Sequence, residues 1–447
     1  MRPHVRFITL GCRVNQYESE AMRESLAGSG FNEINSGNTD VLPEASKKGV
    51  DYVVINTCTV TRGADRENIY WIRRARREHP KAKIVVTGCF IEKNRKQIED
   101  IPEVDLVLGN RDKAKISSLL SPSCGTPAIQ DEKNKETRRH EFTPLSISRS
   151  QDHSRAYIKI QDGCNHACAF CKVVLVRGRS RSREMLDIAD EAKRLADSGH
   201  KEVVLAGIQL GAYGFDLSQP KHLTDAIEAC SKVSGIQRIR LSSIEPTDVT
   251  PGLIEMMRDN PKCCPHLHIP LQSGDDEVLK GMNRRYLRSY YIELVERLKT
   301  AIPDFELTLD VMAGFPGEEE RNFHNTIDLL ERVKPLKCHV FPYSKREGTR
   351  AFRFEDVPAA AIRDRVKRLI AVADNLAAKV KEPYIGKTVS VLVEQKRRKG
   401  AGGLLQGVSA NFLKVYFQGH TDHMGQIVPV RLLTLQGPAF LGRVVES

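Results

Sequence analysis

The sequence predicts an α/β protein of three parts: an N-terminal parallel-sheet βα domain, a central (βα)6 partial barrel and a small C-terminal β barrel. Three observations support this prediction. Strand-like apolar runs alternate with helical stretches as far as Val380, which is typical of parallel sheets. The chain has 447 residues, more than a single hydrophobic core normally accommodates. After Tyr384, short apolar runs separated by glycines replace the alternation, such as 388–393, 414–417 and 426–433, as in small antiparallel barrels or sandwiches.

The N-terminal domain is predicted to cover residues 1–125. Its strand-like runs lie at 7–10, 52–56, 84–87 and 104–108. Helical stretches are expected near 16–27, 64–78 and 111–120. From about residue 121 the sequence becomes polar and contains several prolines and a charged stretch, so we expect a linker at 126–150.

The central domain is predicted to cover residues 151–382. Its strand-like runs lie at 157–160, 203–206, 239–241, 267–270, 307–311 and 337–341, with helical stretches such as 185–197, 223–231 and 287–300 between them. Six such βα units predict a partial barrel, whose active site would lie at the C-terminal ends of the strands. A helix at 363–380 precedes the third domain, predicted at 383–447.

Composition restricts the class of protein. No apolar run is long enough to span a membrane and residues 1–30 resemble no signal peptide, so we expect a cytoplasmic protein without membrane association. Lys and Arg number 69 against 57 Asp and Glu, and the formal charge of +12 favours a polyanion such as nucleic acid as partner. The 11 cysteines stay reduced in a cytosolic chain, so grouped cysteines indicate metal or cluster ligation.

Cys164, Cys168 and Cys171 form a CxxxCxxC group directly after the first strand of the predicted partial barrel. Thiolates are the usual ligands of iron–sulphur clusters, and three of them leave the fourth iron of a cubane open to an outside ligand. Zinc is the alternative, with His166 as a candidate further ligand. Phe170 either lies against a nucleoside base or packs the loop. The position at a strand end favours a catalytic cluster.

A second set of cysteines is far apart in the sequence. Cys12, Cys58 and Cys89 each follow the end of a predicted parallel strand. Neighbouring parallel strands deliver their C-terminal ends to one edge of the sheet, so the three cysteines should converge there. Three independent buried cysteines are the alternative, and a second three-thiolate cluster is the sharper hypothesis. Candidate polar groups around such a cluster are Asn15, Gln16 and Asn56.

The segment DGCNHACAFC resembles the radical S-adenosylmethionine superfamily, whose CxxxCxΦC loop, with an aromatic residue at Φ, binds a four-iron cluster. The resemblance implies that S-adenosylmethionine chelates the open iron and that one electron cleaves its sulphonium to give a 5′-deoxyadenosyl radical. Cofactor contacts are then expected on the strand ends, although turn or capping roles are the ordinary alternative. The candidates are Phe170, Gly207, Gln209, Ser243, Glu245, Gln272, Ser273 and residues 314–318.

Both cysteine sets together resemble the methylthiotransferase family over nearly the whole chain. The segments that carry this resemblance are TLGCRVNQYES, NTCTVT, VTGC, HLHIPLQSG, DVMAGFPGE and HVFPYSKREGT. The resemblance implies a second [4Fe-4S] cluster, held by Cys12, Cys58 and Cys89, that serves as platform for the incoming sulphur. The sequence looks most like the branch that acts on N6-threonylcarbamoyladenosine beside the tRNA anticodon.

Four positions depart from the usual family pattern. Lys172 and Leu175 stand where apolar residues and a proline are common, Ala167 replaces a larger residue, and Glu319 stands where threonine is typical. None of the four is a cluster ligand. The departures therefore concern substrate geometry more than the reaction.

Two regions are candidate RNA contacts. Arginines alternate just after the cluster loop, which suits phosphate or base contacts, with a solvated charged loop as the alternative. They are Arg177, Arg179, Arg181 and Arg183. The C-terminal segment is basic and resembles the TRAM domain of RNA-modifying enzymes. Its candidates for base stacking are Asn411, Phe412, Tyr416 and Phe417, at least one of which is expected to fill the core instead.

These expectations define one function and its alternatives. The resemblance implies a tRNA methylthiotransferase that adds a methylthio group to ring carbon 2 of N6-threonylcarbamoyladenosine. Its cofactors would be two [4Fe-4S] clusters and S-adenosylmethionine, and its partners a tRNA anticodon stem-loop, a reducing electron donor and a sulphur donor. The same chemistry on isopentenyladenosine or on an aspartate of a ribosomal protein is one alternative. A non-catalytic iron–sulphur RNA-binding regulator is another.

Overall fold

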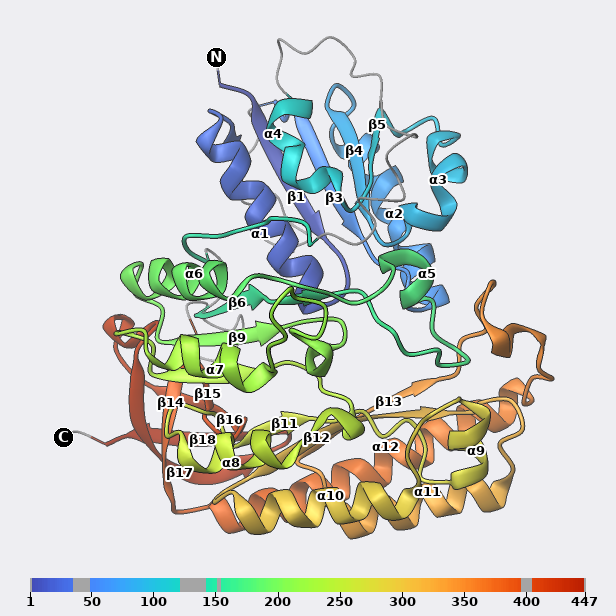
Figure 1. The fold of residues 1–447 in the computed structure, drawn as a ribbon, viewed down its shortest axis with the longest axis vertical. Helices are drawn as coiled ribbons and strands as arrows, with labels where there is room; N and C mark the ends of the chain where they lie inside the picture. Colours follow the sequence, from blue (N-terminus) through green and yellow to red (C-terminus); the bar gives the residue numbers. More distant parts are fainter. Residues whose placement is uncertain (1, 35–48, 121–141, 151–153, 395–403, 446–447) are drawn as a thin grey trace.

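The computed structural model describes residues 2–34, 49–120, 142–150, 154–394 and 404–445. Its first part is a parallel five-stranded sheet with helices on both faces (Figure 1). In spatial order the strands are β2 (Asn32–Glu33), β1 (His4–Thr9), β3 (Tyr52–Thr57), β4 (Lys83–Gly88) and β5 (Leu106–Leu108). One face is covered by α1 (Arg13–Gly28) and α4 (Ile116–Leu119), and the other by α2 (Arg62–Glu78) and α3 (Ile91–Glu99).

Strand β3 shows why the sequence of this sheet is continuously apolar. Val53 and Ile55 pack in the core on the α2 and α3 side, whereas Val54 packs on the α1 and α4 side. Because both faces are covered, successive residues of a central parallel strand are all buried. The polar and thiol groups of this part are therefore concentrated at the strand ends, which point toward the rest of the chain in Figure 1.

The central part is an open barrel of parallel strands. Its two ladders have the orders β10-β9-β6 and β11-β12-β13, and isolated bridges at Ile239–Cys263 and Ser243–His268 join them. In the described residues no ladder joins β6 to β13, so the barrel is partial. The strands are β6 (Arg155–Lys159), β9 (Glu202–Ala206), β10 (Arg238–Leu241), β11 (His266–His268), β12 (Glu306–Ala313) and β13 (Lys337–Pro342).

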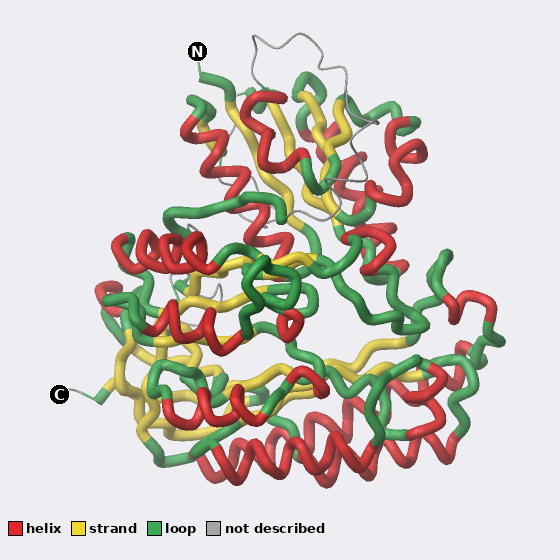
Figure 2. Tube along the Cα trace, viewed as in Figure 1, coloured by secondary structure: helices red, strands yellow, loops and turns green. Residues whose placement is uncertain are grey.

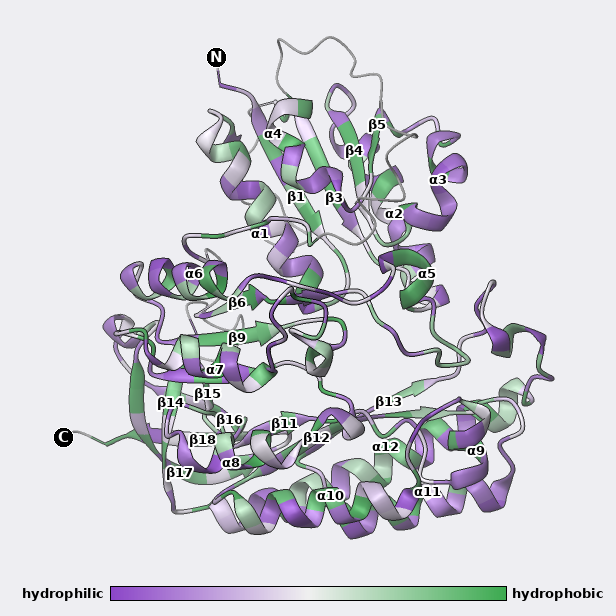
Figure 3. Ribbon diagram, in the orientation of Figure 1, coloured by the Kyte–Doolittle hydropathy of each residue, from purple (hydrophilic) through white to green (hydrophobic). Residues whose placement is uncertain are grey.

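Helices cover the outside of this barrel, as Figure 2 shows. They are α6 (Met185–Asp197), α7 (Leu223–Ser231), α8 (Pro251–Asp259), α9 (Asp276–Gly281), α10 (Arg288–Ala301), α11 (Glu320–Val333) and α12 (Ala359–Lys381). The short elements α5 (Val173–Arg177), β7 (Gln161–Asp162) and β8 (Arg181–Ser182) follow the first strand. Hydrophobic residues gather on the strands and on the inner sides of these helices in Figure 3. Tyr17 and Ala21 of α1 belong to the same core, so the N-terminal part packs directly on the barrel.

The C-terminal part is a closed five-stranded barrel with its own core. Its strands are β14 (Thr388–Val393), β15 (Leu405–Ser409), β16 (Lys414–Gln418), β17 (Ile427–Gln436) and β18 (Ala439–Val444). All neighbouring strands are antiparallel except β16 and β18. Two arginines attach it to the central part, because Arg238 donates to the carbonyl of Ser390 at 2.7 Å and Arg240 to that of Ser409 at 3.1 Å.

The predicted fold class is confirmed in all three parts, and the elements differ in detail. Helix α3 was not predicted, and the helix expected at 111–120 is a 3-10 turn, η2 (Asp112–Lys115), followed by the single turn α4. Two barrel strands, β15 and β18, were also missed. Most of the linker expected at 126–150 lies outside the described residues. No helix in the described ranges is long and apolar enough to cross a membrane.

Candidate functional site

Cys12, Cys58 and Cys89 lie at the C-terminal edge of the N-terminal sheet, directly after β1, β3 and β4. They are neighbours in space, because the charges of Cys12 and Cys89 both act on the pKa of Cys58. Burial, the largest effect, raises the pKa of the Cys58 thiol to about 12 and also raises that of Cys89, whereas Cys12 is exposed. The fold therefore brings the second cysteine set together as the sequence predicted.

Two glycines explain how the loops approach so closely. A Cβ atom on Gly11 would lie 2.7 Å from the Cys58 sulphur. Gly88 has a φ of +106°, and a Cβ there would lie 2.4 Å from the carbonyl oxygen of Thr57. Both distances are too short for any side chain. The packing of the three loops therefore requires glycine directly before Cys12 and directly before Cys89.

Asparagine side chains hold the three loops in place. Asn15 Nδ2 donates to the carbonyls of Leu10 and Thr57, at 2.8 and 2.9 Å. Asn56 Nδ2 donates to the carbonyl of Asn15 at 2.9 Å, and Asn68 Nδ2 donates to that of Cys58 at 2.6 Å. Asn15 and Asn56 therefore lie where the sequence suggested. Asn68 was missed because nothing in helix α2 marks it. The side chain of Gln16 makes no hydrogen bond within the described chain.

A buried network of charges connects this edge to the central part. Arg177 Nε donates to the Cys89 sulphur at 3.1 Å, and its Nη1 pairs with Glu18 at 2.5 Å. Lys159 pairs with both Glu18 and Asp162 at 2.7 Å, and Lys113 also pairs with Glu18. Burial alone would raise the pKa of Glu18, but Arg177 and the two lysines hold it well below its usual range.

The charges of this network do not balance within it. Three nearly inaccessible cations, Lys113, Lys159 and Arg177, face the two carboxylates of Glu18 and Asp162. Arg181 adds a further positive charge at the edge, 3.4 Å from Asp162. Buried charges are stable only when they are paired. Arg177 directs its part of this surplus positive charge at the Cys89 sulphur, where a ligating thiolate would supply negative charge.

The alternating arginines were predicted as RNA contacts, and for three of them this hypothesis is wrong. Arg177 and Arg181 are buried in the network with Asp162, and Arg183 is buried in an ion pair with Glu191. Their alternation places them toward carboxylates that the protein itself supplies. Arg179 is exposed and remains available.

The loop of Cys164, Cys168 and Cys171 follows β7 and lies at the C-terminal end of the barrel strands. The amide of Cys164 donates to the carbonyl of Gly178 at 3.0 Å, which closes the loop on itself. Cys164 and Cys168 both act on the pKa of Cys171, which burial raises to about 12. Arg284 Nη1 lies 3.4 Å from the Cys168 sulphur. The three thiols therefore form one local site.

Several candidate cofactor contacts surround this loop. Gln209 Oε1 accepts from the amide of Asn165 at 3.0 Å, and Glu245 pairs with Arg284. Gly207 leaves room for Gln161, whose Oε1 would lie 2.9 Å from a Cβ there. Gln272 has a φ of +65° and a buried Oε1 atom without a hydrogen bond among the described residues.

Other candidates have structural partners. The ring of Phe170 packs edge-on against Phe315, with centroids 6.4 Å apart, as expected for loop packing. The Ser273 hydroxyl accepts from the amide of Asp275 at 3.3 Å. Ser243 forms an isolated parallel β-bridge with His268. The hydroxyl of the preceding Ser242 has no hydrogen bond within the described chain.

The residues present fit a cluster with an open iron and an amino acid bound to it. The loop provides the thiols of Cys164, Cys168 and Cys171. Several buried polar atoms of the barrel rim have no hydrogen bond within the described chain. These atoms are His166 Nε2, Asp248 Oδ2, Ser242 Oγ and Gln272 Oε1. In the described ranges no three His, Cys, Asp or Glu side chains converge at the spacing of a single metal ion.

A further contact closes the interface on its other side, and the sequence did not reveal it. Arg346, in the loop after β13, donates to the carbonyl of Thr59 at 2.8 Å and pairs with Asp65 at 2.7 Å. Thr59 directly follows Cys58. The N-terminal and central parts are therefore joined by arginine contacts at Arg177 and at Arg346.

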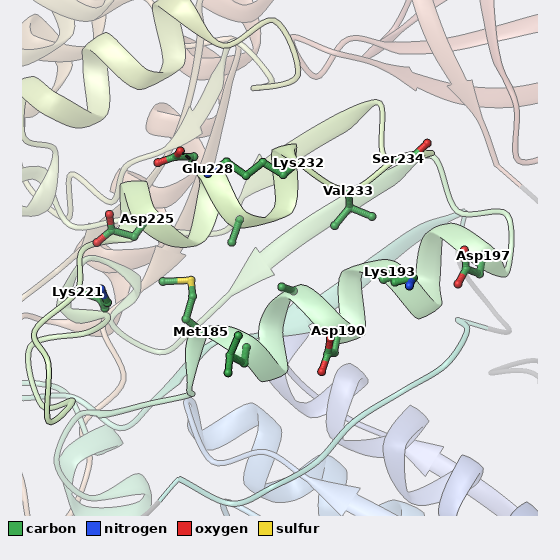
Figure 4. A pocket seen from close by; sticks show the side chains of 13 residues that line it. Met185, Asp190, Lys193, Asp197, Lys221, Asp225, Glu228, Lys232, Val233 and Ser234 are labelled. Carbon is green, nitrogen blue, oxygen red and sulfur yellow. Dashed lines mark ion pairs between the residues drawn. The ribbon is translucent and has the colours of Figure 1, made fainter.

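Two hollows lie away from this chemistry. One, of about 660 Å³, lies between α6 and α7 on the outside of the barrel, where Met185, Lys193, Asp225 and Glu228 line it (Figure 4). The other, of about 980 Å³, lies on the C-terminal barrel. Neither contains a cysteine or a candidate cofactor contact. Their sizes therefore say nothing about the reaction.

Three of the four C-terminal candidates have structural roles, contrary to the hypothesis that they stack on bases. Phe417 is buried in the core of the small barrel, and Phe412 stacks on His266 with ring centroids 4.3 Å apart. Tyr416 lies between Val415 and Phe417 on β16, outside that core, and lines a hollow on the barrel. Asn411 is buried and donates to the hydroxyl of Tyr384 at 3.1 Å. Phe417, Phe412 and Asn411 fill the barrel and its contact with the central part, so they are not free to contact bases.

Comparison with known proteins agrees with this geometry. A family model described as the Radical SAM superfamily matches residues 158–330, and one described as Uncharacterized protein family UPF0004 matches residues 4–109. The threonylcarbamoyladenosine tRNA methylthiotransferase MtaB of Bacillus subtilis is 37% identical, over 99% of this chain and 97% of that protein. The tRNA-2-methylthio-N(6)-dimethylallyladenosine synthase of Acetivibrio thermocellus is 34% identical, over 98% and 90%.

Two further comparisons extend this result. MtaB of Thermotoga maritima is 35% identical, over 96% of this chain and 94% of that protein. Among solved structures, the radical S-adenosylmethionine methyltransferase TsrM of Kitasatospora setae has a TM-score of 0.56 at 15% identity, over 76% and 73% of the two chains, and is similar in fold. Since the sequence relatives match almost from end to end, the chain belongs to the tRNA methylthiotransferases of the radical S-adenosylmethionine superfamily.

Proposed function

We propose that this protein adds a methylthio group to ring carbon 2 of N6-threonylcarbamoyladenosine beside the anticodon of tRNA. The names of the relatives at 35–37% identity support this substrate. The observation that carries the reaction is the pairing of two cysteine trios across one domain interface, joined by Arg177. Arg177 follows the loop of Cys164 and donates to the Cys89 sulphur, so it links the two sites.

Each trio is assigned to one [4Fe-4S] cluster in this proposal. Cys164, Cys168 and Cys171 would hold the cluster that binds S-adenosylmethionine, and the set at the sheet edge would hold the auxiliary cluster, whose ligands are Cys12, Cys58 and Cys89. Bound there, the clusters and cofactor supply one-electron cleavage of the sulphonium and a platform for sulphur. The chain itself binds and orients these groups and keeps water from the interface.

Residues on the barrel rim are proposed to hold the cofactor. The uncommitted Gln272 Oε1 and Asp248 Oδ2 atoms are suited to its amino group. Gly207 and Gln209 are proposed to face its methionine part. The remaining proposed contacts are Phe170, Ser243, Glu245 and Ser273.

The proposal also names partners and a place of action. A tRNA anticodon stem-loop is the substrate, and the net charge of +12 suits it. Arg179, which is exposed beside the cluster loop, is a proposed phosphate contact. A reducing electron donor and a sulphur donor complete the reaction, and we propose that it occurs in the cytoplasm, where thiols stay reduced.

The direct test is nucleoside analysis. Mass spectrometry of tRNA from a deletion strain should show loss of 2-methylthio-N6-threonylcarbamoyladenosine, with the unmethylthiolated nucleoside in its place. Unchanged levels would refute the proposed substrate. The dimethylallyladenosine activity is the second candidate, because a relative at 34% identity carries that name. It predicts that the methylthio group is lost from dimethylallyladenosine instead.

A second experiment separates catalysis from RNA binding alone. The reconstituted protein should contain about eight irons per chain and release 5′-deoxyadenosine after anaerobic reduction with the cofactor. Cys168→Ala should abolish this product while leaving about four irons. RNA affinity without any 5′-deoxyadenosine would indicate a binding protein rather than an enzyme.

A further inference from the structure

The inner wall of the partial barrel is polar on one side. His266 Nε2 and His268 Nδ1 lie 3.0 and 2.9 Å from the Thr308 hydroxyl, and His268 Nε2 lies 3.1 Å from Asp310. At the end that faces the C-terminal barrel, Phe412 stacks on His266. Apart from His266 Nδ1, which has no hydrogen bond within the described chain, the polar atoms of these side chains are committed to one another.

Arg13 enters this space from the N-terminal part. It is the first residue of α1, directly after Cys12, and one turn further Tyr17 packs in the barrel core. The side chain of Arg13 is half-buried and makes no hydrogen bond or ion pair with any described residue. It lies within electrostatic range of residues on β6, β10, β11, β12 and β13. These residues are Tyr157, Arg155, Arg240, Asp310, His266 and His339.

Arg13 begins the helix whose Tyr17 packs in the barrel core, and its electrostatic neighbours lie on five of the six strands, so its guanidinium faces the barrel interior. The anions of that interior already have partners. Glu202 accepts from Arg240 at 2.7 Å, and Asp310 pairs with His268. Arg240 repels Arg13, whereas Asp310 attracts it without forming an ion pair. A half-buried cation without a direct anionic partner is an unfavourable arrangement that an incoming anion would relieve.

We propose that Arg13 binds the carboxylate of the threonylcarbamoyl group and thereby selects this substrate. The inference rests on the proposed function and names the residue behind its specificity. Threonine is linked to the base through its amino group, so its carboxylate is free, and a guanidinium binds a carboxylate with two parallel hydrogen bonds. A dimethylallyl group carries no charge, so it would leave Arg13 desolvated and unpaired, which disfavours that base.

The location next to Cys12 gives this contact a second consequence. A carboxylate held by Arg13 fixes the modified base beside the auxiliary cysteines, between the two sites that the reaction needs. Arg13 is therefore a binding residue whose loss should change affinity before it changes cluster content. That separation makes a binding experiment the appropriate test.

The experiment uses the full chain with both clusters reconstituted and synthetic anticodon stem-loops. One RNA carries the threonylcarbamoyl group, a second carries the same group with its carboxylate converted to a carboxamide, and a third carries dimethylallyladenosine. Fluorescence anisotropy should show the protein binding the carboxylate form about tenfold to hundredfold more tightly than the carboxamide form. Arg13→Gln should bring this ratio close to one, and Arg13→Lys should give an intermediate ratio because it keeps the charge without the two-pronged geometry.

Arg179→Gln is the control, since loss of an exposed phosphate contact should weaken all three RNAs equally. If Arg13→Gln or Arg13→Lys retains the ratio of the unmodified protein at full iron content, the inference is wrong. Failure of the proposed function gives a different result. The deletion strain would then lose the methylthio group from another nucleoside, whatever the behaviour of the Arg13 variants.

Discussion

The two cysteine sites are built in different ways. One trio comes from residues 164–171 of a single segment, which is closed by the hydrogen bond from the amide of Cys164 to the carbonyl of Gly178. The other is assembled from three strand ends that only the register of the sheet brings together. The loop site therefore depends on local backbone geometry. The sheet-edge site depends on the whole N-terminal fold and on the domain beside it.

Each site nevertheless has one arginine on one sulphur. Arg284 contacts Cys168 from the same domain, whereas Arg177 reaches Cys89 from across the domain interface. Hydrogen bonds and positive charges at cluster sulphurs raise reduction potentials. The central domain therefore supplies the contacts of its own cluster site, and through Arg177 it also completes the site of the N-terminal domain.

The variant with the largest expected effect, Gly88→Ala, disrupts the sheet-edge site and leaves the loop site intact. In Gly88→Ala the new Cβ would lie 2.4 Å from the Thr57 carbonyl, at a φ of +106° that disfavours any side chain. We expect the loop of Cys89 to be displaced and the iron content to fall from about eight to about four per chain. Gly252→Ala is the control, because nothing lies within 4 Å of a Cβ there. Full iron content in Gly88→Ala would show that the sheet edge tolerates a shift.

Arg177→Gln tests the link between the sites. Without Arg177 the network has a smaller positive surplus, because Lys113, Lys159 and Arg181 then face Glu18 and Asp162. We therefore expect a folded protein that is destabilised by about 2 kcal/mol, the value of a charge-assisted hydrogen bond. The auxiliary cluster should lose a donor and a positive charge, so its reduction potential should fall. Redox titration followed by electron paramagnetic resonance, in a Cys168→Ala background, measures this change.

Arg183→Gln is the matched control for Arg177→Gln. Arg183 is equally buried but pairs with Glu191 rather than with a cysteine. Its loss should reduce stability without changing the potential of the auxiliary cluster. Equal potentials in both variants would mean that the contact with Cys89 has only a structural role.

A third prediction separates pH effects on the fold from those on the clusters. Burial raises the pKa of Glu306 to about 7, and Tyr384 donates to its Oε1 atom at 2.8 Å. Since the folded pKa exceeds the usual value of 4.5, this group stabilises the fold most at low pH, and that contribution is lost as the pH rises through 7. Glu306→Gln keeps the bond from Tyr384, so at pH 8 it should raise the free energy of unfolding by up to about 3 kcal/mol.

The measurement is urea denaturation of Glu306→Gln and the unmodified protein at pH 5 and pH 8. The difference should be large at pH 8 and small at pH 5, with unchanged iron content, because Glu306 lies beside the C-terminal barrel. Glu318, whose pKa burial also raises to about 7, leaves part of the pH dependence in place. An equal difference at both pH values would contradict the assigned protonation.

The strands could be predicted because their environment leaves a plain pattern in the sequence. β3 is buried on both faces and is continuously apolar. Helix α3 leaves no such pattern, because only Ile91 and Ile98 are buried and the backbone departs from helical geometry at Asn94. The missed strands β15 and β18 belong to a barrel whose closure leaves no local pattern in the sequence.

The two cysteine sites also differ in how the sequence indicates them. The spacing of Cys164, Cys168 and Cys171 is itself the signal, and the general rule for parallel sheets was enough to group the other cysteines. The role of Arg177 was interpreted wrongly, because its partner Glu18 lies 159 residues away in the chain. Alternating arginines look alike whether carboxylates or phosphates face them. Only the folded chain shows which of these is present.

The smallest predicted effect concerns the loop site. Arg284 bridges Glu245 and the Cys168 sulphur, and its Nε lies 3.3 Å from the Tyr286 hydroxyl. A lysine keeps the charge but cannot reach all three partners, so Arg284→Lys should keep the full iron content and form 5′-deoxyadenosine about tenfold more slowly, equivalent to about 1.4 kcal/mol. Arg288→Lys, on an outer helix, should leave the rate unchanged. A normal rate in Arg284→Lys would show that the loop holds its cluster without help, which would make the contrast with the sheet-edge site sharper still.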